Sequence, residues 1–220
     1  MALKAVFFDL DGTLLDTAPN FVIAMNKMLE RKNRPAISSD ELHEVVSEGA
    51  HAMLKRVFGV DTTLPEFAPL RSEFLDIYLE DLASGTTPYP GIESLITEIK
   101  NSKLTWGVVT NKPATYAEPL MTFFNFAVPP KVVICPEHVA ERKPAPDALL
   151  LACRQSGCEP HEAIYIGDHR RDIECGINAG MPTVAVGYGY IHADDCHTHW
   201  NADHTVMEAH EIWPIINNYL

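Results

Sequence analysis

Residues 4–13, which read KAVFFDLDGT, decide the fold. The apolar run from Lys4 to Phe8 is rich in Val and Phe and too short for a helix, so it predicts a buried strand. Asp9 and Asp11 follow this strand, and alternation along an extended segment places both side chains on the same side. Two carboxylates this close repel each other and stay ionised together only beside a cation, and an oxygen-preferring ion such as Mg²⁺ fits that role.

Similar apolar runs recur along the rest of the chain. They are residues 105–110, 131–135, 163–167 and 183–187, and a last strand is expected near 203–206, before a closing helix. Segments of about 10 to 20 residues with helical periodicity separate the first five runs. This alternation predicts an α/β fold with a doubly wound parallel sheet. Such sheets bind ligands at the carboxyl ends of their strands, where Asp9 and Asp11 lie.

The segment between the first two strands has a different pattern, with three amphipathic helical stretches in place of strands. These stretches are residues 19–31, 39–58 and 65–83. A helical block between two strands of one sheet is an inserted domain. We therefore expect a catalytic core of residues 1–16 and 87–220, and a helical cap domain of residues 17–86. The hinges are expected near residues 16–19 and 85–91, the second of which holds two prolines and two glycines.

Composition limits the partners and the compartment. The chain of 220 residues is 46% hydrophobic with a formal net charge of −13, so it can bury a full core and is not expected to bind nucleic acid or an anionic membrane surface. Its opening apolar run is too short for a signal peptide, and no stretch approaches the ~20 apolar residues that span a bilayer. We expect a cytoplasmic protein, monomeric or homodimeric. The five cysteines are odd in number and lack a C-x-x-C pair, which indicates reduced thiols.

Polar side chains follow the later strands or lie in the loops after them. They are Thr110, Asn111 and Lys112 after the second strand, Lys143 in a later loop, and Asp168 and Asp172 after the fourth strand. Each has an ordinary explanation when taken alone, such as a strand-end cap, a solvated loop charge or a helix N-cap. Chance assembly of the whole series at successive strand ends is improbable, so together they predict one site.

This series resembles the four motifs of the haloacid dehalogenase superfamily, and specifically its phosphatases with a helical cap. The resemblance covers essentially the whole chain. The matching residues are Asp9 with Asp11, Thr110, Lys143, and Asp168 with Asp172. The dehalogenases of the superfamily lack the second aspartate of the first motif, which this chain has.

The resemblance implies a role for each motif residue. Asp9 is then the nucleophile and a Mg²⁺ ligand, and Asp11 is the general acid and base, binding the metal through its backbone carbonyl. Asp168 is the other protein ligand, while Thr110 and Lys143 hold the phosphoryl oxygens. A covalent aspartyl-phosphate divides a very slow hydrolysis into two easier displacements.

Asp172 is implied to support the metal shell and Lys143. His169 is a departure, because relatives often carry a small polar or acidic residue there, and we expect it to line the pocket rim.

Within the superfamily the chain resembles the phosphoglycolate phosphatase-like group. More narrowly, it is similar to the N-acetylmuramic acid 6-phosphate phosphatases of bacterial cell-wall recycling. The segments that carry this likeness are residues 16–19, 106–113, 134–139 and 188–192. A 2-phosphoglycolate phosphatase and a sugar-phosphate mutase, which shares all four motifs, remain as alternatives.

The cap is expected to choose the substrate, a small phosphate ester, because it closes over the leaving group. His51 is the first candidate contact and Arg71 the second, although both residues also fit a solvated surface. Asn111 and Lys112 directly follow the phosphate-binding threonine and are candidates to touch a phosphate or leaving-group oxygen.

Other classes fit the sequence less well. A phospho-acceptor signalling module uses similar residues, but its acceptor lies on a later strand and it needs no cap. A dinucleotide-binding fold fails because no G-x-G-x-x-G follows the first strand. A zinc site among the C-terminal histidines is conceivable, but this segment is better explained as a loop followed by a last strand and a helix.

Overall fold

The computed structural model describes residues 2–43 and 45–220. Met1 and Glu44, which fall in the predicted core and in the second predicted cap helix, lie outside the described residues. The chain forms two compact units, Met1–Leu15 with Pro88–Leu220, and Asp16–Thr87. Each unit is described separately below.

The first unit is built on a parallel sheet. Its strands are β1 (Ala5–Phe8), β4 (Thr105–Val109), β5 (Val133–Ile134), β6 (Ala163–Gly167), β7 (Thr183–Val186) and β8 (His204–Val206). Their order is β5-β4-β1-β6-β7-β8, and every neighbouring pair is parallel. The predicted fold class is therefore confirmed.

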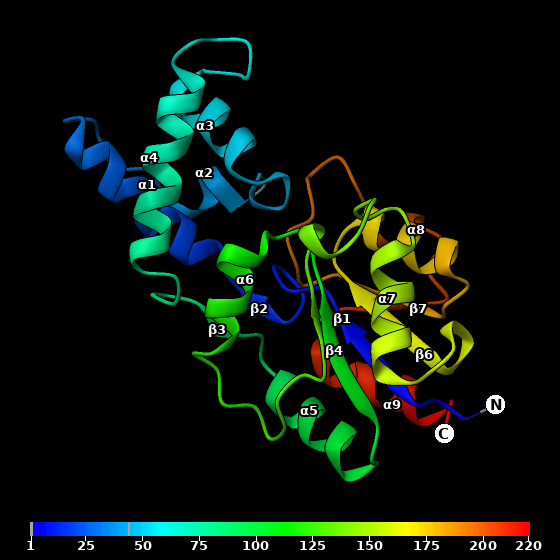
Figure 1. Ribbon diagram of the computed structural model, residues 1–220. Helices are drawn as coiled ribbons and strands as arrows, with labels where there is room; N and C mark the ends of the chain where they lie inside the picture. The colour runs from blue at the N-terminus through cyan, green and yellow to red at the C-terminus, as the bar shows by residue number, and fades with distance from the viewer. Residues whose placement is uncertain (1, 44) are drawn as a thin grey trace. The chain divides into compact units, whose positions relative to one another are not determined.

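The sheet is covered on both faces, which explains why its strands are apolar runs without alternation. Every residue of β1, β6 and β7 is buried. The covering helices are α5 (Ile92–Asn101), α6 (Ala114–Met121), α7 (Asp147–Ser156), α8 (Arg170–Ala179) and α9 (Ile212–Asn217). In Figure 1, α7 and α8 lie together along one face of the sheet, while α5 and α9 lie along the other.

The strand order places β1 at the point where the direction of winding reverses. The chain runs from β1 outward through β4 to β5, and then returns to β6 on the other side of β1. Phe8 pairs in register with Val108 on one side and with Ile166 on the other. The residues that follow these three strands therefore emerge side by side at one edge, where sheets of this kind bind ligands.

The second unit is helical. Its helices are α1 (Ala18–Arg31), α2 (Ser39–His43), the short 3₁₀ turn η1 (Val46–Glu48), α3 (Ala50–Phe58) and α4 (Phe67–Glu80). Phe21 and Tyr78 stack with their ring centroids 4.5 Å apart, which joins α1 to α4. The side-chain amide of Asn20 donates to the backbone carbonyls of Asp81 and Ser84, at 2.7 and 2.8 Å.

Two details differ from the prediction. The predicted helical stretch over residues 39–58 is divided into α2, η1 and α3, and the chain turns at Gly49, whose φ is +78°. The two short strands β2 (Leu15–Asp16) and β3 (Thr87–Pro88), which pair with each other, were not predicted. Strands of two residues are too short to show a periodic pattern.

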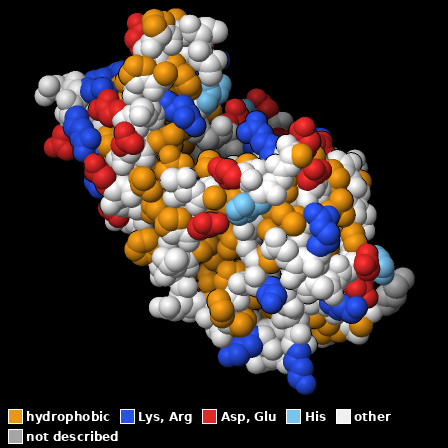
Figure 2. All heavy atoms as spheres, in the orientation of Figure 1, with side chains coloured by type: hydrophobic (Ala, Val, Ile, Leu, Met, Phe, Trp, Pro, Cys, Tyr) orange, Lys and Arg blue, Asp and Glu red, His pale blue; other side chains and the backbone are white. Residues whose placement is uncertain are grey.

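Surface charge is mixed on the face drawn in Figure 2, where acidic side chains are interspersed with lysine and arginine. Within residues 2–43 and 45–220, none of the helices is long and apolar enough to cross a membrane.

Candidate active site

Asp9 stands at the end of β1, at the centre of the ligand-binding edge. Its backbone N–H donates to the carbonyl of Ile166 at 2.9 Å, which continues the pairing of β1 with β6. The chain then turns, and the N–H of Gly12 donates to the carbonyl of Leu15 at 2.9 Å. A β-carbon on Gly12 would overlap the Asp168 carboxylate, so this position requires glycine.

Lys143 is buried among four partners. Its ammonium nitrogen lies 2.8 Å from Oδ1 of Asp9 and 2.7 Å from Oδ1 of Asp172. It also donates to the hydroxyl of Tyr165 at 2.9 Å and to the backbone carbonyl of Val109 at 3.1 Å. Burial alone would lower the pKa of Lys143, but the Asp172 and Asp9 carboxylates outweigh it and raise this pKa above its ordinary value. Lys143 is therefore held as a cation at the end of β1.

Asp168 is held by two donors from distant parts of the chain. Its Oδ1 accepts from the Thr13 hydroxyl at 2.9 Å, and its Oδ2 accepts from the backbone N–H of Tyr190 at 2.8 Å. A β-carbon on Gly189 would overlap the Asp168 side chain, so glycine again leaves room for a carboxylate. These contacts fix the Asp168 carboxylate in one orientation.

The carboxylates of Asp9, Asp168 and Asp172 form a buried acidic triad. One ligand oxygen from each lies within 4.8 Å of the others. Burial raises the pKa of Asp9 to about 6, although the Lys143 ammonium opposes the shift. Burial and the charges of Asp9 and Asp172 likewise raise the pKa of Asp168 well above its usual range. The combined negative charge of three close carboxylates exceeds the single positive charge of Lys143, so the triad fits a divalent cation.

The C-terminal histidines do not join such a cluster. In the part of the chain that the structure describes, no other set of three histidine, cysteine or acidic side chains has its ligand atoms as close together.

Asp11 lies beside Lys112. The Lys112 ammonium donates to Oδ1 of Asp11 at 2.8 Å, and the exposed fractions of the two side chains are 5% and 19%. The Lys112 backbone N–H also donates to the hydroxyl of Thr110 at 3.1 Å. Lys112 thus connects two predicted site residues, while its contact with a substrate stays a prediction.

Asn111 and His169 have structural contacts. The Asn111 amide nitrogen donates to the Lys143 backbone carbonyl at 3.1 Å, which ties the end of β4 to the loop that carries Lys143. His169 precedes α8, where its Nδ1 accepts from the backbone N–H of Arg171 at 3.1 Å and its ring stacks on Trp200. Burial lowers the pKa of His169 to about 4, so it caps this helix as a neutral ring.

His51 and Arg71 belong to the helical unit and are both exposed. The His51 ring packs against the edge of Phe67, with centroids 5.8 Å apart. Because these residues are on the other unit, their predicted contact with the substrate stays a prediction.

Tyr165 contacts Lys143 in the site, although no sequence motif indicates it. It is fully buried in β6, and its hydroxyl accepts from Lys143 at 2.9 Å while donating to the Val109 carbonyl at 2.8 Å. In an apolar strand a tyrosine is indistinguishable from other core aromatics. The phenol itself was the available signal, because a buried hydroxyl usually requires a partner.

Tyr165→Phe is expected to lower kcat about tenfold while changing KM little, because Lys143 loses a neighbour that fixes its position. Steady-state kinetics on one phosphate ester would measure both constants. Tyr219→Phe is the matched control, since the Tyr219 hydroxyl contacts His204, 2.9 Å away and outside the site. An unchanged kcat for Tyr165→Phe would show that Lys143 does not need this hydroxyl.

Comparison with known proteins places this architecture in a family. Residues 6–186 match the model of the haloacid dehalogenase-like hydrolases. The chain is 46% identical, over its whole length and 97% of the relative, to the N-acetylmuramic acid 6-phosphate phosphatase of Pseudomonas aeruginosa. It is 37% identical, over 96% of this chain and 95% of the relative, to a phosphoglycolate phosphatase of Xanthomonas campestris.

A solved structure agrees. The crystal structure described as a predicted phosphoglycolate phosphatase from Haemophilus somnus superposes with a TM-score of 0.84 at 25% identity, covering 97% of each chain. The family match spans β1 to β7 and includes all three residues of the acidic triad. The chain therefore belongs to the haloacid dehalogenase-like hydrolases.

Proposed function

We propose that this hydrolase is a Mg²⁺-dependent phosphatase of N-acetylmuramic acid 6-phosphate that works through an aspartyl-phosphate on Asp9. The substrate assignment rests on the identity of 46% and 42%, over the full length of this chain, to two Pseudomonas proteins named N-acetylmuramic acid 6-phosphate phosphatase. The phosphoglycolate phosphatase of Xanthomonas campestris is 37% identical. The arrangement of Asp9, Asp11 and Lys143 supports the mechanism.

In the first step, a carboxylate oxygen of Asp9 attacks phosphorus and the bond to the sugar oxygen breaks. Asp11 gives a proton to that leaving oxygen, which would otherwise depart as an alkoxide. The Lys143 ammonium, 2.8 Å from Asp9, is placed to donate to phosphoryl oxygens next to the nucleophile. Thr110, buried at the end of β4, is the second candidate donor to these oxygens.

In the second step, Asp11 takes a proton from water, and the water oxygen attacks phosphorus. The acyl-phosphate bond breaks, which releases inorganic phosphate and restores the Asp9 carboxylate. Asp11 therefore alternates between acid and base, and each turnover returns it to its starting protonation state. The Lys112 ammonium, 2.8 Å from Asp11, orients this carboxylate in the ground state.

The acidic triad fits the metal that the family uses. Asp9, Asp168 and the backbone carbonyl of Asp11 would hold Mg²⁺, and Asp172 would support them together with Lys143. When bound, the ion supplies positive charge against the triad and the phosphoryl oxygens. The positive charge of the ion offsets locally the protein's net charge of −13, which would otherwise repel an anionic substrate.

The helical unit is proposed to select the sugar, because the core contacts treat every phosphoryl group alike. His51→Ala is expected to raise KM for N-acetylmuramic acid 6-phosphate several-fold while leaving an aryl phosphate unaffected. Kinetics on both substrates would measure this difference, with His161→Ala, an exposed histidine of the core unit, as the control. Equal effects of His51→Ala on both substrates would remove His51 from the specificity site.

The compartment and the partners of the protein are part of the same proposal. All five cysteines are free thiols, which supports a reducing compartment, and we propose the cytoplasm. The partner is a small phosphate ester, and the protein is proposed to act as a monomer or homodimer without nucleic acid or membrane.

The test is phosphate release from a substrate panel with Mg²⁺ or with EDTA. The panel holds N-acetylmuramic acid 6-phosphate, 2-phosphoglycolate, glucose 6-phosphate, glucose 1-phosphate and an aryl phosphate. We expect Mg²⁺-dependent release with the highest kcat/KM for the muramic acid ester. A preference for 2-phosphoglycolate would change the assigned substrate and leave the proposed mechanism unchanged. Conversion of glucose 1-phosphate into glucose 6-phosphate without free phosphate would indicate a mutase instead.

A further inference from the structure

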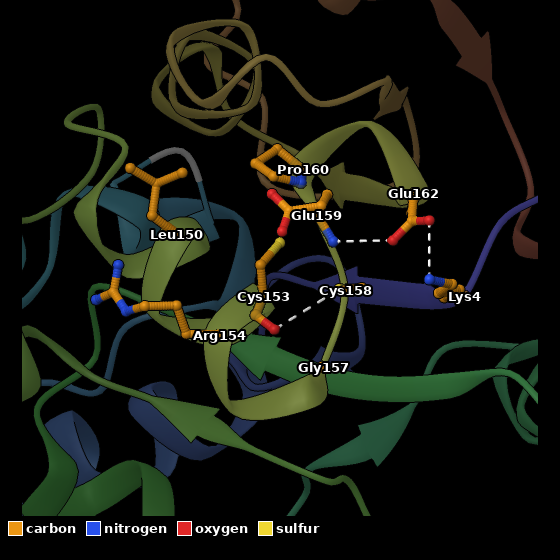
Figure 3. Close-up of a pocket in the computed structure, with 9 residues that line it drawn as sticks. All are labelled: Lys4, Leu150, Cys153, Arg154, Gly157, Cys158, Glu159, Pro160 and Glu162. Atoms are coloured by element: carbon orange, nitrogen blue, oxygen red, sulfur yellow. Dashed lines mark hydrogen bonds and ion pairs between the residues drawn. The ribbon is translucent and has the colours of Figure 1, made fainter. Parts of the chain in front are cut away.

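A pocket lies in the core unit at the edge of the sheet where the strands begin. Lys4 immediately precedes β1 and Glu162 immediately precedes β6, whereas the acidic triad follows the ends of these strands. The pocket has a volume of about 520 Å³, and its lining includes Cys153, Cys158 and the ion pair between Lys4 and Glu162. Figure 3 shows Cys153 at the end of α7 and Cys158 on the loop that follows.

The end of α7 brings the two cysteines together. The backbone N–H of Cys158 donates to the carbonyl of Cys153 at 3.1 Å, and Gly157 between them adopts a left-handed conformation with φ +74°. A hydrogen bond between residues five apart closes a Schellman-type helix end, and helix ends of this kind commonly place the two side chains in contact. Here the two cysteine side chains are close enough for each to shift the pKa of the other. The Cys158 sulfur also lies 3.9 Å from the Cys153 carbonyl oxygen.

We propose that Cys153 and Cys158 form an oxidation site, at which hydrogen peroxide converts the two thiols into an intramolecular disulfide. Both cysteines line the pocket, with exposed fractions of 2% for Cys153 and 9% for Cys158, and the helix end holds them as neighbours in the folded chain. This site is separate from the acidic triad and does not depend on the substrate of the enzyme.

Cys158 is the thiol that reacts first. The hydrogen bond from Cys153 lowers the pKa of Cys158, while the same bond raises the pKa of Cys153. The thiolate is the nucleophile in thiol oxidation. Burial raises the pKa of Cys135 and of Cys175 to about 12, so neither competes as a thiolate.

The reaction balances in two steps. The Cys158 sulfur attacks one peroxide oxygen, the O–O bond breaks, and a sulfenic acid and one water form. The Cys153 sulfur then attacks the sulfenic sulfur, the S–S bond forms, and the hydroxyl leaves as a second water after taking up the Cys153 proton. Two thiols are oxidised and one peroxide is reduced to two waters.

Peptide mapping of the folded wild-type protein tests the proposal directly. Trypsin cleaves after Arg154 and places the two cysteines on different peptides. These peptides stay linked only if a disulfide joins them. After peroxide treatment and alkylation of remaining thiols, we expect a linked pair of these peptides that dithiothreitol separates. Cys196, the most exposed of the five cysteines, reports the peroxide dose, because its hydrogen bond with the Thr198 hydroxyl, 3.0 Å away, lowers the pKa of its thiol.

Single variants check the order of reaction. In Cys153→Ser, Cys158 should stop at the sulfenic acid and be trapped by dimedone, whereas Cys158→Ser should leave Cys153 largely unmodified. The proposal is overturned if Cys196 is oxidised while the Cys153 and Cys158 peptides stay unlinked, or if both cysteines end as sulfonic acids without the disulfide. The wild-type map decides the question even if a variant fails to fold.

Discussion

Asp9→Asn is expected to reduce turnover by a factor on the order of 10⁴ or more, because an amide cannot form the acyl-phosphate. The substitution keeps the shape of the side chain and removes one buried negative charge. Phosphate release from the preferred ester would measure the loss. Asp147→Asn, in the first turn of α7, makes the same chemical change outside the site and should retain full activity. Activity of Asp9→Asn within tenfold of wild type would contradict the nucleophile assignment.

The same mechanism predicts that Asp11→Asn, unlike Asp9→Asn, is still phosphorylated by an aryl phosphate. A phenolate leaves without a proton, so the first step proceeds, while the second step lacks its base. Intact mass spectrometry should then find a phosphoryl group on the protein, and Asp9→Asn should show none. An Asp11 variant that stays unphosphorylated, yet binds the ester, would assign Asp11 another role.

The strands of the core could be predicted because short contiguous segments of the sequence determine them. Residues 163–167 form an apolar run between turn residues, and the structure makes the same five residues a strand. Once parallel strands are placed side by side, their following residues must share an edge. The proximity of Asp9 and Asp168 follows from this geometry, whereas Lys143 reaches Asp9 from a loop after β5. The catalytic roles of all three stay predictions.

What could not be predicted depends on contacts between distant segments. Thr13 and Tyr190 hold the Asp168 carboxylate across 155 and 22 residues of sequence, and no local pattern announces such pairs. Tyr165 is hidden within an apolar strand. The hydrogen bond from the Asn111 amide nitrogen to the backbone of the Lys143 loop is another long-range contact of this kind.

The helical unit was less predictable for a different reason. Amphipathic periodicity shows that a segment is helical on average, but a short interruption leaves the periodic pattern nearly intact. The periodic pattern over residues 39–58 therefore does not show that the chain forms α2, η1 and α3 in place of one helix. Residues such as His51, which are exposed, carry no burial signal that separates a substrate contact from a solvated side chain.

Lys143→Met is expected to lower the free energy of unfolding by about 3–5 kcal/mol, because removing one partner of a buried ion pair leaves uncompensated charge. The Lys143 side chain is 1% exposed and bridges Asp9 and Asp172 at 2.8 and 2.7 Å. Urea unfolding in EDTA, followed by circular dichroism, would measure the change. Lys112→Met is the matched control, and its loss should be nearer about 1 kcal/mol because the partner Asp11 is 19% exposed and can be hydrated.

The double variant Lys143→Met with Asp172→Asn separates the two roles of the lysine. Removing the Asp172 charge should recover part of the lost stability, since only Asp9 then remains without its cation. Phosphatase activity should stay low, because the phosphoryl oxygens still lack the ammonium. If the double variant is no more stable than Lys143→Met, then the loss came from packing around the side chain and not from charge. If it instead regains activity, then Lys143 serves the fold alone and the phosphoryl-binding role must pass to another residue.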